Sequence, residues 1–307
     1  MLHKLQTWIK STLKNRPSNG PFEEYHKNKQ TKCRGNHRDG QLHGNFESYF
    51  PNSQPESRGH YEAGCKLGVW EHFYESGSLL CRECYEGGQP HGEQTVYHGN
   101  GQISKQLTFS HGVKTGTWCL FHLNGQLRSR GSYRDDQRTG PFEVFFPSGQ
   151  RRSRGTHELG QRHGGYESYH ANGRVETVGT FGRGRKEGAW TVYYDNGQLA
   201  YQIDYRDDAM TGRLEQFHEN GQRKSIGSFT DGHKHGQFKE YFDSGQLLAS
   251  KNYKHGLEDG SYQTYYPNGQ LKTDGNFKLG ELEGPFEMYD ENGDLEEKGR
   301  YKNGYLQ

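Results

Sequence analysis

The chain has 307 residues, a net charge of +1, 29% hydrophobic residues and 44 glycines. This charge implies no overall attraction to nucleic acid or membrane, and the apolar content is too small for a sizeable two-layer core. Tyrosine and phenylalanine, 21 and 16 in number, recur at fixed intervals, which argues against disorder. Together these features favour a single-layer sheet whose hairpins pack mainly on their neighbours.

Residues 1–19 precede the regular part of the chain, and Pro17 lies near the end of this segment. Its apolar residues fall on one helical face: Leu2, Leu5, Trp8, Ile9 and Leu13. We therefore expect an amphipathic helix over 1–19 that covers the open edge of the first hairpin. The alternative is a basic anchor on a membrane surface. The segment lacks the apolar run of a signal peptide or a membrane span.

From residue 20 onward the sequence repeats every 24 residues, and a glycine marks the start of each of twelve copies: 20, 44, 68, 92, 116, 140, 164, 188, 212, 236, 260 and 284. We count this glycine as offset 0. Offset 5 is aromatic in all twelve copies, offset 8 is Asn or Ser, and offsets 9 and 20 are Gly in ten. A strict period of this length predicts stacked supersecondary units. We expect twelve repeats over 20–307.

Each repeat reads as a β-hairpin. In the eleventh copy Pro267, Asn268 and Gly269 suit a tight three-residue loop, with glycine at the position of positive φ. This loop predicts that offset 5 lies opposite offset 11, and offset 2 opposite offset 14. The predicted fold class is therefore all-β, an elongated single-layer antiparallel hairpin array with a short N-terminal helix.

Offsets 2 and 14 vary together, as cross-strand neighbours would. An aromatic residue at offset 2 accompanies an arginine at offset 14 in five repeats: Phe22/Arg34, Phe46/Arg58, Trp70/Arg82, Trp118/Arg130 and Phe142/Arg154. A guanidinium over an aromatic ring is a favourable cross-strand pair. This pattern predicts that the rings and the arginines share one face of the sheet.

A candidate partner-binding site follows from that face. It contains four arginines and two large rings from two adjacent repeats: Trp118, Arg128, Arg130, Phe142, Arg152 and Arg154. Arginine and tryptophan are frequent interface hot spots, and the cluster suits an acidic protein. The alternative is that Arg130 and Arg154 only stack on their paired rings. Arg128 and Arg152, at offset 12, have no paired ring and are the sharper probes.

No pattern in the sequence indicates catalysis, a metal or another cofactor. Histidines that share an offset in adjacent repeats lie about 10 Å apart, too far to share a zinc ion, and His233 with His235 lacks an evident third ligand. Cys81 and Cys84 point to opposite faces of one strand. We expect free thiols, a reducing and hence cytoplasmic compartment, and a non-enzymatic protein.

The repeated pattern resembles a known family. Its core, Asn-Gly-Gln-Leu at 124–127, 196–199 and 268–271, is similar to the MORN-repeat variant of bacterial proteins of the YwqK antitoxin type. The resemblance covers residues 20–307 and implies a hairpin meander with a protein-binding role, in some members immunity to a toxin. It implies no catalytic residues.

Two functions follow as hypotheses. The first is a non-enzymatic protein-binding scaffold, in its specific form an antitoxin that neutralises a toxin with an acidic surface. The alternative is a membrane-surface scaffold that binds anionic lipid through residues 1–19 and the basic segment 128–186. We expect no nucleic-acid partner.

Overall fold

The computed structural model describes residues 18–307, which form 29 strands joined by turns and contain no helix. The predicted fold class is therefore wrong in combining the array with a helix. The helix was placed over 1–19, of which 1–17 lie outside the described residues, and Ser18 and Asn19 form a bend. These two residues accept the hydrogen bonds that a preceding repeat would accept. The carbonyl of Ser18 accepts from the Gly40 amide at 2.7 Å, and Asn19 Oδ1 accepts from the Asp39 amide at 2.8 Å.

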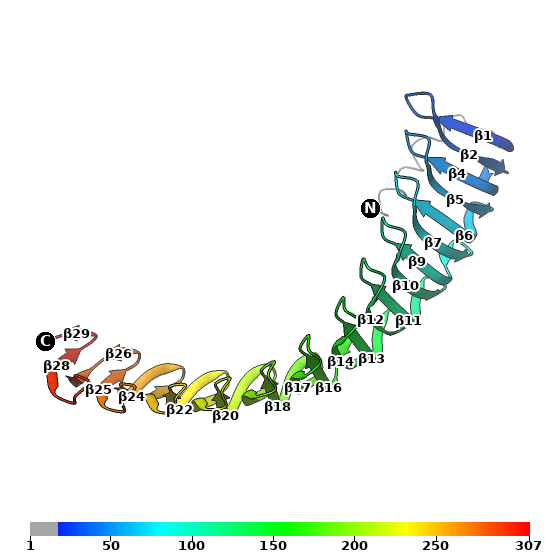
Figure 1. Ribbon diagram of the computed structural model, residues 1–307. Coiled ribbons are helices and arrows are strands. Elements are labelled where there is room, and N and C mark those ends of the chain that lie inside the picture. The colour runs from blue at the N-terminus through cyan, green and yellow to red at the C-terminus, as the bar shows by residue number, and fades with distance from the viewer. Residues whose placement is uncertain (1–17) are drawn as a thin grey trace. The chain divides into compact units, whose positions relative to one another are not determined.

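The described chain forms two compact units, residues 18–149 and 150–307. The boundary lies within the sixth repeat, and no change of period marks it. Within each unit, neighbouring strands run antiparallel and follow one another in chain order (Figure 1). Four strands of only two residues lie in line with the strand that follows them, and both segments pair with the preceding strand. Each repeat contributes one hairpin.

The strands of the first unit are β1 (Gly20–Tyr25), β2 (Thr31–Arg38), β3 (Gln41–Leu42), β4 (Gly44–Tyr49), β5 (Pro55–Glu62), β6 (Cys65–Phe73), β7 (Leu79–Glu86), β8 (Gln89–Pro90), β9 (Gly92–Tyr97), β10 (Ile103–Ser110), β11 (Val113–Phe121), β12 (Leu127–Arg134) and β13 (Gln137–Phe145).

The strands of the second unit are β14 (Arg151–Glu158), β15 (Gln161–Arg162), β16 (Gly164–Tyr169), β17 (Val175–Gly182), β18 (Arg185–Tyr193), β19 (Leu199–Arg206), β20 (Ala209–Phe217), β21 (Arg223–Thr230), β22 (His233–Tyr241), β23 (Leu247–Lys254), β24 (Leu257–Tyr265), β25 (Leu271–Lys278), β26 (Glu281–Leu282), β27 (Gly284–Tyr289), β28 (Leu295–Lys302) and β29 (Tyr305–Leu306).

A β-bulge in each hairpin changes the predicted register. In the eleventh repeat Tyr265 lies opposite Leu271, as predicted for offsets 5 and 11. The bulge then inserts one residue at offset 12, so that Tyr262 at offset 2 lies opposite Gly275 at offset 15. The predicted pairing of offsets 2 and 14 is wrong by one residue. Because successive side chains alternate between faces, this shift moves offset 14 to the face opposite offset 2.

The asparagine at offset 8 closes its own turn and ties it to the next repeat. Asn268 Oδ1 accepts from the Gln270 amide at 2.9 Å, and Asn268 Nδ2 donates to the carbonyl of Glu291 at 2.8 Å. The same inter-repeat bond starts from seven other asparagines: Asn28, Asn52, Asn100, Asn124, Asn172, Asn196 and Asn220. One side chain thus explains both the turn and the regular stacking of repeats.

Offset 6 makes a second bond to the next repeat, which explains why histidine recurs there. Nε2 of His122 lies 3.1 Å from the carbonyl oxygen of Phe145, and the hydroxyl of Tyr194 donates to the carbonyl of Phe217 at 2.9 Å. A carbonyl only accepts, so Nε2 carries the proton in these histidines. Histidine and tyrosine are interchangeable at this offset because both present a donor at the end of a ring.

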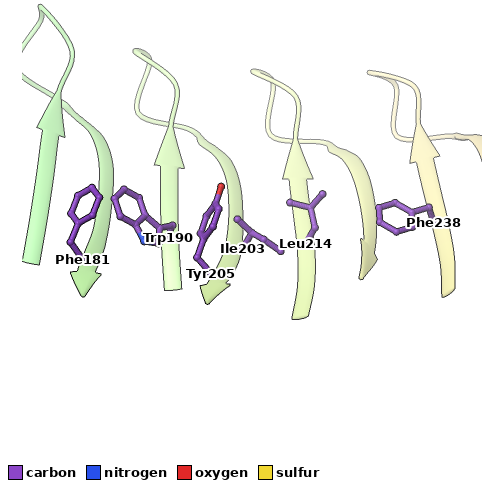
Figure 2. Close-up of a cluster of buried hydrophobic side chains, with 6 residues drawn as sticks. All are labelled: Phe181, Trp190, Ile203, Tyr205, Leu214 and Phe238. Carbon is purple, nitrogen blue, oxygen red and sulfur yellow. The ribbon is translucent and has the colours of Figure 1, made fainter. Parts of the chain in front are cut away.

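The core lies on the face that carries offsets 2, 15 and 17, which we call the ring face. In the second unit its buried cluster consists of Phe181, Trp190, Ile203, Tyr205, Leu214 and Phe238, which follow one another across neighbouring strands (Figure 2). Rings at offset 2 pack directly over glycines at offset 15. A Cβ on Gly179 would lie 2.2 Å from Cδ2 of Trp190. Glycine at offset 15 is therefore required by the close approach of a ring.

We predict that Gly179→Ala destabilises the second unit by about 1–3 kcal/mol, because the added methyl overpacks the ring face against Trp190. Gly165→Ala in the same hairpin is the matched control. Nothing lies within 4 Å of its added Cβ, so the expected change is within about 0.5 kcal/mol. Urea unfolding of both variants measures the difference, and equal stability of the two would contradict this account of the core.

Candidate binding surface

The face opposite the ring face carries a ladder of arginine–glutamate pairs in the first unit. Arginines at offset 14 reach glutamates at offset 3 of the following repeat, and a glutamate can hold two arginines. The N–O distances are 2.5 Å for Arg34–Glu47, 2.6 Å for Arg58–Glu71, 2.6 Å for Arg82–Glu71 and 2.6 Å for Arg130–Glu143. We call these four arginines, with their glutamates, the arginine face.

Aromatic side chains at offset 5 support this ladder. The Arg34 guanidinium lies 5.6 Å from the ring centroid of Tyr49, and Arg58 lies 5.2 Å from that of Phe73. The Tyr49 hydroxyl also donates to Glu47 at 2.6 Å. That hydrogen bond, together with Arg34, lowers the pKa of Glu47 against the effect of its partial burial. The Glu47 carboxylate therefore remains ionised in neutral solution.

The arginines project further into solvent than the carboxylates. The exposed fraction of the side chain is 56% for Arg58 against 13% for Glu71, and 57% for Arg130 against 17% for Glu143. A partner that approaches this face meets guanidinium groups first. Because each guanidinium is already held by a carboxylate and, for two of them, by a ring, little side-chain freedom remains to be lost on binding.

The structure separates the predicted site residues of the first unit. Trp118 and Phe142 lie on the ring face with only 6% of each exposed. Trp118 lies opposite Gly131, while Arg130 lies opposite Cys119 and reaches Glu143 on the other face. The expected stacking of Arg130 on Trp118 is therefore wrong, and the reason is the bulge at offset 12.

The remaining predicted residues are exposed arginines. Arg128 is the bulge residue between the pairs Leu120–Ser129 and Phe121–Leu127. Arg152 has the same offset in the second unit, and Arg154 there forms an ion pair with Glu167 at 2.9 Å. Their binding role remains a prediction.

The cations that do cover the rings were not predicted from the sequence. They come from offset 22, and four of them span two rings each. Lys66 Nζ lies 4.2 Å from the ring centroid of Trp70 and 4.7 Å from that of Tyr85. Equivalent contacts start from Lys114, Arg138, Arg162, Lys186 and Lys234. A basic residue occurs at offset 22 in six repeats, and this regularity could have predicted these contacts.

A polar network replaces the ring–glycine contact at one place in the first unit. Glu83 stands at offset 15 instead of glycine, and Gln94 stands at the following offset 2 instead of a ring. Glu83 is 9% exposed and accepts hydrogen bonds from the Tyr85 hydroxyl at 2.6 Å and from Gln94 Nε2. His72 Nε2 lies 3.6 Å from the same carboxylate. The two substitutions thus compensate each other.

The network determines how Glu83 titrates. Burial by itself raises the pKa of this carboxyl, but the neighbouring His72 imidazole and the hydrogen bonds from Tyr85 and Gln94 outweigh it and lower the pKa to about 2. The folded-state pKa is below the unfolded one, so the ionised carboxylate stabilises the fold above pH 4.5. This contribution is lost as the pH falls from about 4.5 to about 2.

We predict that the double variant Glu83→Gly with Gln94→Phe, which restores a ring beside glycine, removes this acid-sensitive contribution. The wild type should lose up to about 3 kcal/mol more of its unfolding free energy than the variant between pH 5 and pH 2. Urea unfolding at the two pH values measures this difference between proteins. An equal loss in both would show that Glu83 is not the responsible group.

Within residues 18–307, no helix has the length and apolar character needed to cross a lipid bilayer. None of the curated proteins matches the sequence. Among solved structures, the crystal structure of TcdB2-TccC3-TEV is 14% identical over 99% of this chain and 17% of its own, with a TM-score of 0.18. The crystal structure of TcdB2-TccC3 is 9% identical over 92% of this chain and 19% of its own, also with a TM-score of 0.18. The chain spans less than a fifth of either, and similarity at this level carries no argument.

The family model of the MORN repeat variant matches nine segments, which together span more than half of the chain: residues 42–63, 66–86, 90–111, 114–135, 186–207, 210–231, 234–255, 258–279 and 282–303. The predicted resemblance to this repeat is confirmed, and the narrower resemblance to YwqK-type antitoxins stays a prediction. The chain belongs to the MORN repeat variant family and is a repeat scaffold.

Proposed function

We propose that the protein is a non-enzymatic scaffold that binds an acidic protein through the arginine face of its first unit. The observation that carries this proposal is the fixed, outward-facing set of guanidinium groups at Arg34, Arg58, Arg82 and Arg130, each held by a recessed glutamate. The carboxylates hold the arginines in place without covering them.

The spacing of these groups favours a macromolecular partner. Two strands per repeat place equivalent residues about 10 Å apart. Arg58 and Arg82 converge on the one carboxylate of Glu71, so a small molecule would contact at most such a pair, whereas a protein surface would contact arginines of several repeats. Arginine and aromatic residues are enriched in protein interfaces. Recognition by a positive surface favours carboxylate-rich partners and speeds their association.

We predict that Arg34→Gln with Arg58→Gln and Arg130→Gln abolishes capture of the partner. The matched control, Arg183→Gln with Arg185→Gln and Arg206→Gln, removes the same charge from exposed arginines of the second unit. Exposed ion pairs contribute about 0–1 kcal/mol each, so both variants should stay folded. Affinity capture from native-host lysate and titration with the isolated partner compare four proteins. These are the wild type, the two variants above and the double variant Arg128→Glu with Arg152→Glu.

The expected result is one stoichiometric, acidic partner that the wild type and the control bind and that the arginine-face variant does not. Loss of affinity in Arg128→Glu with Arg152→Glu would extend the interface to the bulge positions, as the sequence analysis predicts. The absence of a stoichiometric protein partner, or equal affinity of all four proteins, would contradict the proposal.

In its specific form, the proposal is that the bound partner is a toxin and that the scaffold neutralises it. The resemblance of the Asn-Gly-Gln-Leu repeats to YwqK-type antitoxins supports this form. Expression of the captured partner alone should arrest growth of host cells, and co-expression of the wild-type scaffold, but not of the arginine-face variant, should restore it. A partner without effect on growth would exclude the antitoxin role and leave the scaffold function standing.

A further inference from the structure

Two histidines and a glutamate meet at a turn of the first unit, outside the arginine face. Glu86 is the last residue of β7, His91 lies between β8 and β9, and His111 occupies the turn between β10 and β11. The two histidines come from successive repeats, at offsets 23 and 19. No metal site was predicted from the sequence, because histidines at equal offsets lie about 10 Å apart in adjacent repeats and His233 with His235 lacks an evident third ligand.

The donor atoms have the separation that a small metal ion requires. Glu86 Oε2 lies 3.4 Å from His91 Nδ1 and 3.6 Å from His111 Nε2, and one ligand atom from each of the three residues lies within 4.8 Å of the others. Zinc bonds of about 2.1 Å in a tetrahedron place neighbouring ligand atoms about 3.4 Å apart. Two imidazoles and a carboxylate are a ligand set that zinc accepts, with water in the fourth position.

The backbone holds the three side chains in place. The His91 amide donates to the carbonyl of Cys84 at 2.8 Å, and the Gly112 amide donates to the carbonyl of Pro90 at 2.7 Å. The latter bond fixes the turn that carries His111 against the segment that carries His91, with their ring centroids 4.7 Å apart.

The hydrogen-bond contacts of the two imidazoles are compatible with metal binding. His111 Nδ1 lies 3.4 Å from the Ser110 hydroxyl, which leaves Nε2 directed toward Glu86. A hydrogen bond to the ring nitrogen that does not bind the metal orients a metal-binding imidazole. His91 Nδ1 lies 3.4 Å from the His111 amide, at the long end of a hydrogen bond, and this contact would give way to the metal.

Other repeats of the same chain contain incomplete copies of this cluster. His163 Nε2 lies 3.4 Å from Glu158 Oε2, but Arg183 stands where His111 would be. His235 and His255 have ring centroids 6.2 Å apart, but Thr230 stands where Glu86 would be. Each copy lacks one ligand, so the three-residue set distinguishes Glu86, His91 and His111 from histidines that serve only the turn.

We propose that Glu86, His91 and His111 bind one divalent transition-metal ion, with zinc as the probe, and that the ion cross-links the third and fourth repeats. This inference is independent of the proposed partner. Ligands from two successive turns make the ion an additional link between hairpins. Because the three side chains are 60%, 39% and 66% exposed, the ion enters and leaves from solvent without opening the fold.

The test is calorimetric titration of the full-length, tag-free, metal-stripped protein with zinc chloride. We expect the wild type to bind one zinc ion per chain. Glu86→Gln and His111→Ala should each lower the affinity for zinc by about 10–100-fold or more. Alanine tolerates this turn, since Ala63 occupies the equivalent position with φ of 45°. The control variants His163→Ala and His255→Ala should bind zinc as the wild type does.

A gain-of-site variant makes the test sharper. Arg183→His completes the cluster around Glu158 and His163, and we expect this variant to bind two zinc ions per chain. The thermal unfolding midpoint of the wild type should rise with zinc, and that of His111→Ala should not. Failure of the wild type to bind zinc, or an affinity lowered equally by His111→Ala and His255→Ala, would overturn the proposal.

Discussion

The β-bulge at offset 12 is the constraint on which the surface chemistry depends. By adding one residue to the second strand of each hairpin, it places offset 2 opposite offset 15 and offset 14 opposite offset 3, as Tyr262–Gly275 and Gln263–Asp274 show. Rings consequently pack over glycines on one face, and arginines pair with glutamates on the other. Without the bulge, the same sequence would place its arginines over its rings and leave the glutamates at offset 3 without a cation across the strand.

The two faces stabilise the sheet by different means, and this division accounts for the low apolar content. The ring face excludes water with aromatic side chains, glycines beneath them and the aliphatic stems of offset-22 lysines such as Lys186, whose ammonium lies 4.5 Å from the ring centroid of Trp190. The arginine face is held by charge-assisted hydrogen bonds that remain accessible to solvent. A single layer therefore needs no second sheet to cover it. Glu83 and Gln94 show that a buried hydrogen-bonded pair can replace the ring–glycine contact on the ring face when both residues change together.

The sequence predicted the hairpin repeat, its turn and the pairing of Tyr265 with Leu271, because glycine at fixed offsets and the Pro-Asn-Gly loop act locally. It did not predict the bulge, since a single inserted residue leaves no mark in the glycine spacing. The covariation of Trp118 with Arg130 was real but was assigned to the wrong contact. Trp118 packs against Gly131 of its own hairpin, whereas Arg130 pairs with Glu143 of the following repeat. The Glu86, His91 and His111 cluster was missed because it joins different offsets of successive repeats, a relation that only the stacking geometry defines.

The hydrogen bonds between repeats have a consequence for how such a chain changes length. Each bond from an offset-8 asparagine, such as Asn196 to Glu219, reaches 23 residues along the chain and no further. Removing or duplicating one complete 24-residue segment within a unit would therefore present every remaining donor with an equivalent acceptor. Unequal recombination between tandem copies can lengthen or shorten this scaffold in whole steps, whereas a deletion of any other size leaves the donors of one hairpin without acceptors.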